Sequence, residues 1–125
     1  MERVIPAYAG TSGHGRADMR PILRQSVAMR GGWVYMMTNK PGGVIHTGVT
    51  ADIVARVAQH RAGEGSKFCR KYNLQRLVLA EPYPTIEEAI VREKRIKEWQ
   101  RPWKIALIEK ANPEWTDLWE VVLGA

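Results

Sequence analysis

Two strand-forming runs joined by a short turn place the strongest constraint on what this chain can fold into. Residues 33–38 are apolar and rich in strand formers, and residues 44–49 have the same character. The five residues between them include a Pro-Gly-Gly sequence that is typical of a turn. We therefore predict a β-hairpin as the start of a small sheet.

A helix is predicted directly after the hairpin. Thr50 can cap this helix, and residues 51–61 carry an apolar stripe at helical spacing. A third, short strand follows over residues 77–80 and is closed by Pro82 and Pro84.

Two further helices are predicted in the C-terminal half. Thr85 and Glu88 form a capping box, which begins a helix over residues 86–99. Pro102 can begin another helix over residues 103–111. The expected order is β-β-α-β-α-α: a small single α/β domain with a three-stranded, mainly antiparallel sheet flanked by helices.

The N-terminal segment differs from the rest of the chain. Residues 1–28 contain several glycines and prolines, and no apolar period of a strand or helix persists there. We predict a flexible extension over residues 1–28, with Met29 as a plausible true start, and a domain over residues 29–125.

Composition narrows the class of protein. Hydrophobic residues make up 45% of the 125 residues, which favours a globular domain, and no apolar stretch is long enough for a membrane span. The single cysteine, Cys69, excludes an internal disulfide framework, and we expect no disulfide-linked partner. The 19 basic and 13 acidic residues give a net charge of +6, which favours a polyanionic partner.

Two pairs of polar side chains on predicted elements could carry chemistry. Tyr35 and His46 lie on the two arms of the hairpin and share a site if they lie on one sheet face; otherwise they are two partly buried rings. Arg56 and His60 are four residues apart on one helical face, where an arginine binds phosphate or simply faces solvent. Both alternatives stay open at this point.

Glu93 interrupts the apolar stripe of the helix over residues 86–99. A carboxylate in that position is unfavourable unless it is paired or binds a metal ion. Lys97, four residues later, offers a salt bridge as the alternative to a metal.

Basic residues gather in two clusters that also contain aromatic residues. Such mixtures suit phosphate contacts and base stacking, or they form a solvated face beside an aromatic core. The first cluster consists of Lys67, Phe68, Arg70, Lys71, Tyr72 and Arg76, and the second of Arg92, Lys94, Arg95, Lys97, Trp99, Arg101, Trp103 and Lys104.

Taken together, these stretches resemble the small stand-alone bacterial branch of the GIY-YIG nuclease superfamily. The resemblance covers roughly residues 32–119, and its motifs are specific as an ordered set. The matching segments are Trp33-Val34-Tyr35, His46-Thr47-Gly48-Val49-Thr50, Arg56 to His60, Gly65-Ser66-Lys67-Phe68, Glu88 to Lys97, and Trp103 to Leu118.

The resemblance implies cleavage of DNA phosphodiester bonds with Mg²⁺ or Mn²⁺. Glu93 would be the only protein ligand of the ion, and Arg56 would hold the scissile phosphate. Tyr35 or His46 would help to activate the attacking water, and His60 belongs to the same catalytic set. His46 departs from the family, which has tyrosine there; histidine can accept a proton near neutral pH. We expect Tyr35, His46, Arg56 and Glu93 to converge on one groove.

The resemblance also implies a DNA partner and a bacterial cytoplasmic location. The expected nucleic-acid contacts are Lys67, Arg70, Lys71, Lys97 and Asn112. We expect an endonuclease of DNA repair or branched-DNA processing. The alternatives are a nucleic-acid-binding module without catalysis and an accessory interaction domain that retains the fold. The sequence leaves the oligomeric state and the DNA substrate open.

Overall fold

The computed structural model describes residues 31–124, so the predicted extension over residues 1–28 lies outside the described residues. The order of elements confirms the predicted β-β-α-β-α-α series and adds two short helices, α4 and α7. The elements are β1 (Gly32–Thr38), β2 (Ile45–Thr50), α3 (Ile53–Arg61), α4 (Lys67–Tyr72), β3 (Arg76–Tyr83), α5 (Ile86–Lys97), α6 (Arg101–Ala111) and α7 (Trp119–Leu123).

The three strands form one sheet in the order β2-β1-β3, and both neighbouring pairs are antiparallel. Tyr35 lies opposite Gly48, and Met37 lies opposite His46. Because residues two apart on a strand share a face, Tyr35 and His46 lie on the same face of the sheet. The register therefore decides a question that the sequence left open.

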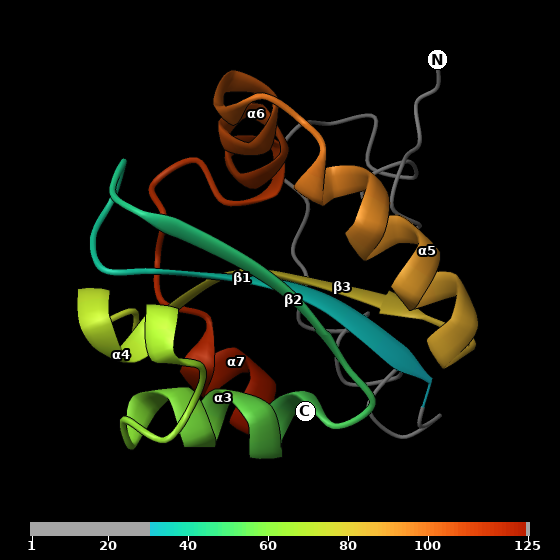
Figure 1. Cartoon of the computed structure of the whole chain (residues 1–125), viewed down its shortest axis with the longest axis horizontal. Coiled ribbons are helices and arrows are strands. Elements are labelled where there is room, and N and C mark those ends of the chain that lie inside the picture. Colours follow the sequence, from blue (N-terminus) through green and yellow to red (C-terminus); the bar gives the residue numbers. More distant parts are fainter. Residues whose placement is uncertain (1–30, 125) are drawn as a thin grey trace.

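Helices cover both faces of this sheet. Figure 1 shows α3, α4 and α7 on one side of the strands and α5 and α6 on the other. The central strand β1 is buried along its whole length, since both of its faces are covered. None of the helices within residues 31–124 is long and apolar enough to cross a membrane.

The first helix begins later than the sequence indicates. Thr50 remains paired with Trp33 in β2, so it cannot serve as the helix cap. Asp52 takes that position, and its Oδ1 accepts a hydrogen bond from the backbone N–H of Ala55 at 3.1 Å. The predicted cap at Thr85 is confirmed, because its hydroxyl accepts from the Glu88 backbone at 3.2 Å.

The first basic cluster contains a helix that was not predicted. Ser66 caps α4 by accepting from the backbone of Cys69, and Asn73 ends it in the left-handed conformation. Few apolar residues mark this segment, so no hydrophobic period indicates a helix. The helix nevertheless buries Cys69 and leaves its basic side chains exposed.

A buried ion pair joins α5 to the sheet on the face opposite Tyr35. Arg92 donates from Nε and Nη2 to the two carboxylate oxygens of Glu81, at 3.1 and 3.2 Å. The Tyr83 hydroxyl donates to the same carboxylate at 2.9 Å. Since Glu81 and Arg92 are both buried, each charge depends on the other for its compensation.

Glu81→Ala is therefore expected to destabilise the domain by about 3–5 kcal/mol, because it leaves the Arg92 guanidinium buried and unpaired. Arg61→Ala provides the control, since Arg61 and Asp117 form an exposed pair that contributes about 1 kcal/mol or less. Urea unfolding of the two variants measures the difference. Equal losses in both would contradict the assignment.

Candidate functional site

The hydroxyl of Tyr35 is the centre of a small polar site. Tyr35 is 1% exposed, in the middle of β1. Its hydroxyl oxygen lies 3.0 Å from Nε2 of His60 in a hydrogen bond and accepts another from Nε of Arg56 at 3.2 Å. The four-residue spacing of Arg56 and His60 on α3 thus brings both side chains to one oxygen atom.

Gly48 makes room for the Tyr35 ring on the neighbouring strand. A Cβ atom at position 48 would lie 2.5 Å from both Oη and Cζ of Tyr35. Only glycine therefore allows the ring to lie across β2. The close approach at Gly48 is thus made by a side chain of the chain itself.

His46 completes a group of three rings. Its ring centroid lies 6.0 Å from that of Tyr35 and 5.6 Å from that of His60. Phe68 of α4 adjoins it on another side, at 6.3 Å. His46 is half-buried, whereas Tyr35 and His60 are buried, so His46 is the ring of the three that retains more contact with solvent.

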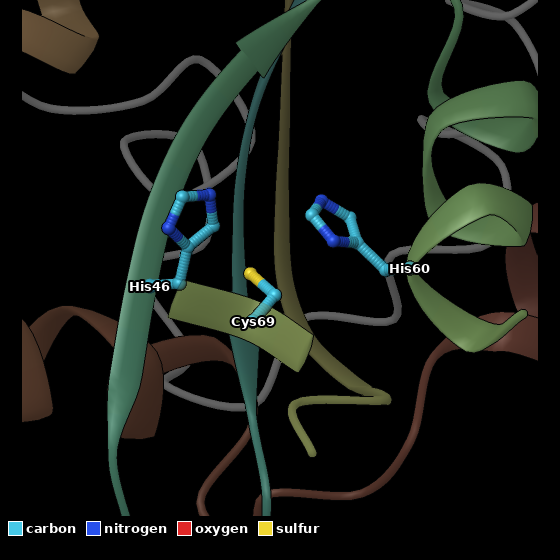
Figure 2. Close-up of side chains that lie close together, drawn as sticks. All are labelled: His46, His60 and Cys69. Atoms are coloured by element: carbon cyan, nitrogen blue, oxygen red, sulfur yellow. The ribbon is translucent and has the colours of Figure 1, made fainter. Parts of the chain in front are cut away.

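Cys69 belongs to the same neighbourhood. Figure 2 shows the side chains of His46, His60 and Cys69 pointing toward one another from β2, α3 and α4. One nitrogen of each imidazole and the Cys69 sulfur lie within 4.8 Å of one another. Sequence reasoning missed this residue, because a single cysteine without a motif gives no signal until α4 is packed against the sheet.

The surroundings hold both histidines neutral. Burial lowers the pKa of His46 to about 4, with smaller effects from the charges of His60, Lys97 and Arg56. Burial and the Arg56 charge lower the pKa of His60 to about 4 as well. Burial raises the pKa of Tyr35, against the opposing hydrogen bond from Arg56. At pH 7 the site therefore holds neutral rings beside a cationic guanidinium.

Glu93 lies on α5, which packs on the opposite face of the sheet. In the described part of the chain its ion-pair partner is Lys97, whose Nζ lies 2.7 Å from Oε2. The charge of Glu93 nevertheless acts on the site: together with burial, which has the larger effect, it raises the pKa of Tyr35. The structure thus brings three of the four expected residues into one group and leaves Glu93 on the helix of the opposite face, in a salt bridge with Lys97.

The expected nucleic-acid contacts lie in different surroundings. Lys67, Arg70 and Lys71 are exposed on α4, where Phe68 and Tyr72 are also exposed. Lys97 is 54% exposed beyond Glu93.

Asn112 does not fit the expected DNA contact. It is buried, and its amide donates to the backbone oxygens of Val78 and Thr116 while its Oδ1 accepts from the Thr116 backbone. Because its amide nitrogen and its carbonyl oxygen are engaged within the fold, the role of Asn112 is to hold the segment after α6.

Comparisons with known proteins point to one family. The family model described as the GIY-YIG catalytic domain matches residues 31–106. A UPF0213 protein of Cupriavidus pinatubonensis is 35% identical over 78 residues, which cover 62% of this chain and 87% of that protein. A UPF0213 protein of Staphylococcus aureus strain Mu50 is 36% identical over 78 residues, with 62% and 94% covered. No solved structure gives a significant match.

Acid is expected to destabilise the domain through the imidazoles of His46 and His60. Both have pKa values near 4 when folded and about 6.5 when unfolded, so the unfolded state binds more protons between these values. Stability is then complete above about pH 6.5 and declines as the pH falls toward 4. Thermal melting of the wild type and of a His46→Asn/His60→Asn double variant measures this effect. The double variant should lose less stability over that interval, and an equal loss would contradict the assignment.

Proposed function

The chain belongs to the GIY-YIG family, and on that premise we propose that it is a metal-dependent endonuclease that hydrolyses DNA phosphodiester bonds. One observation carries the proposal: Arg56 and His60 of α3 are hydrogen-bonded to the Tyr35 hydroxyl of β1, and the His46 ring of β2 lies 6.0 Å from the Tyr35 ring. A water nucleophile, a proton acceptor and a phosphate-binding cation are what such a hydrolysis requires. The UPF0213 relatives match the chain over most of their own length.

Arg56 is the residue that we assign to the phosphate. Its Nε donates to Tyr35 and its Nη1 donates to Gln59 at 2.8 Å, which fixes the plane of the guanidinium. The remaining N–H groups of the fork can bind a phosphate oxygen and the charge that develops on it. Because the guanidinium is fixed before substrate binds, little reorganisation is required.

His46 is the residue that we assign as the general base. It is half-buried and neutral at pH 7, so it can meet an attacking water and accept its proton. Tyr35 is 1% exposed and has a raised pKa, which makes it a poor proton acceptor. We assign Tyr35 an orienting role instead, because its hydroxyl is hydrogen-bonded to both His60 and Arg56 and fixes their side chains.

Glu93 is the residue that we assign to a Mg²⁺ or Mn²⁺ ion. A single carboxylate suits Mg²⁺, which keeps several waters and accepts phosphate oxygens as further ligands. The Lys97 partner is 54% exposed and free to turn into solvent, so the carboxylate can exchange a salt bridge for a metal ion. The bound ion would stabilise negative charge on the phosphate and on the leaving oxygen.

The surface beside the site supports DNA as the substrate. The exposed basic side chains of α4 are Lys67, Arg70 and Lys71. The same helix carries the exposed rings of Phe68 and Tyr72, which contact each other, and Phe68 adjoins His46. Lysine and arginine hold phosphates, and aromatic rings stack on unpaired bases. We propose branched or damaged DNA as the substrate class and the bacterial cytoplasm as the location.

Glu93→Ala is expected to reduce plasmid nicking with Mg²⁺ or Mn²⁺ by about 10²-fold or more, because the metal loses its protein ligand. DNA affinity should change little, since basic side chains supply most of it. Glu87→Ala is the matched control, an exposed glutamate on the same helix that should leave nicking unchanged.

Two results would contradict this assignment. The first is nicking by Glu93→Ala at the wild-type rate. The second is nicking by the wild type in excess EDTA. Salt-dependent DNA binding by a wild type that never nicks would instead support the alternative of a binding module without catalysis, in which His46 has replaced the family's tyrosine.

His46→Ala is expected to lower the nicking rate by about 10²–10⁴-fold, the usual effect of removing a general base. His46→Tyr should recover part of the rate, because it restores the residue that the family has at this position. Tyr35→Phe should be milder, since it removes an orienting group. Single-turnover nicking rates decide the question, and a severe Tyr35→Phe with a mild His46→Ala would assign water activation to Tyr35.

A further inference from the structure

Three side chains in this site have a chemistry that the proposed nuclease reaction does not use together. His46, His60 and Cys69 approach from β2, α3 and α4, and their ligand atoms lie within 4.8 Å of one another (Figure 2). Imidazole nitrogen and thiolate sulfur are ligands for Zn²⁺ and other thiophilic ions, whereas Mg²⁺ selects oxygen. The trio is therefore distinct in kind from the carboxylate of Glu93.

We infer that His46, His60 and Cys69 form a second metal site, which binds Zn²⁺. Two imidazoles and one thiolate leave the fourth tetrahedral position to water, as in open zinc sites with three protein ligands. His46 is half-buried, which gives the ion a way in from solvent.

The orphaned nitrogen of His60 supports this inference independently. His60 is 3% exposed, and its Nδ1 is buried without a hydrogen-bond partner in the described part of the chain. A buried imidazole nitrogen without a partner is unfavourable, and coordination to a metal ion would satisfy it. Its other nitrogen, Nε2, is bonded to the Tyr35 hydroxyl at 3.0 Å. Zinc-binding histidines usually have such a second hydrogen bond, which fixes the ring.

Gly65 keeps the space beside this nitrogen free. A Cβ atom at position 65 would lie 2.2 Å from Nδ1 of His60. The loop between α3 and α4 thus passes the ring without a side chain that would cover the proposed ligand atom.

The three ligand atoms need to move only slightly closer together to bind a zinc ion. Zn–N and Zn–S bonds of the usual lengths place tetrahedral ligand atoms about 3.3–3.8 Å apart, compared with the limit of 4.8 Å in the cluster. Side-chain rotations of about 1 Å at the tips close this difference. As the sulfur–zinc bond forms, the Cys69 thiol releases its proton to solvent. His60 binds through Nδ1 in the tautomer whose Nε2–H donates to Tyr35, and His46 binds through its unprotonated nitrogen.

The site has a regulatory consequence that rests on the proposed function. His46 cannot accept a proton from water while its lone pair binds zinc. Zn²⁺ is therefore expected to inhibit a nuclease that Mg²⁺ activates, and removal of the Cys69 ligand should relieve that inhibition.

The experiment is a titration of the purified full chain, stripped with EDTA, with Co²⁺ followed by Zn²⁺. The expected result is one Co²⁺ per chain, with tetrahedral d–d bands and a sulfur-to-cobalt charge-transfer band, both lost when Zn²⁺ displaces the ion. The chain has one cysteine, so a charge-transfer band can arise only from Cys69.

Matched variants locate the ligands. Cys69→Ser and Cys69→Ala should both lose the charge-transfer band, and His60→Asn should weaken Co²⁺ binding by about tenfold or more. Glu87→Gln should bind as the wild type does, because this exposed glutamate of α5 lies outside the trio. Circular dichroism melts establish that each variant is folded.

The titration uses no DNA, so it separates failure of this site from failure of the proposed function. Absence of the charge-transfer band overturns the inference. One ion per two chains also overturns it, because two cysteines would then share the metal. If Co²⁺ binds as expected but micromolar Zn²⁺ leaves wild-type nicking unchanged, the regulatory consequence is wrong. Inhibition of the wild type with resistance in Cys69→Ser supports it.

Discussion

The hydrogen bonds of the buried Tyr35 hydroxyl are the interaction on which the arrangement of the site depends. A hydroxyl in the middle of a covered strand must be paired, or the fold loses the free energy of its desolvation. Arg56 and His60 pair it from one face of α3. The same bonds fix α3 on the sheet, so a requirement of folding also positions the cation and one imidazole of the site.

The two faces of the sheet handle polar groups in different ways. Beneath α5, Glu81 and Arg92 neutralise each other in a buried ion pair. On the Tyr35 face, burial keeps His46 and His60 neutral beside the Arg56 charge. The Arg56 cation suits an incoming anion, and the neutral lone pairs of the imidazoles suit a metal ion, whereas a closed ion pair suits only the fold.

Patterns within single elements were predicted well, and patterns between elements were not. Strand formers around a Pro-Gly-Gly turn gave the hairpin, and the capping box gave the start of α5. The helix α4 escaped prediction because its exposed surface leaves little apolar period. Asn112 was expected to contact DNA because it lies in a matching motif, yet its amide makes hydrogen bonds within the fold after α6.

The sequence by itself determined the elements, the spacing of Arg56 and His60, and the family, because these follow from local periodicity and from ordered motifs. Only the tertiary structure decided that Tyr35 and His46 share a face, that Cys69 joins the two histidines, and that Glu93 lies on the opposite helical layer with Lys97. The physical reason is that strand register and helix packing depend on contacts between segments far apart along the chain, which no local pattern encodes.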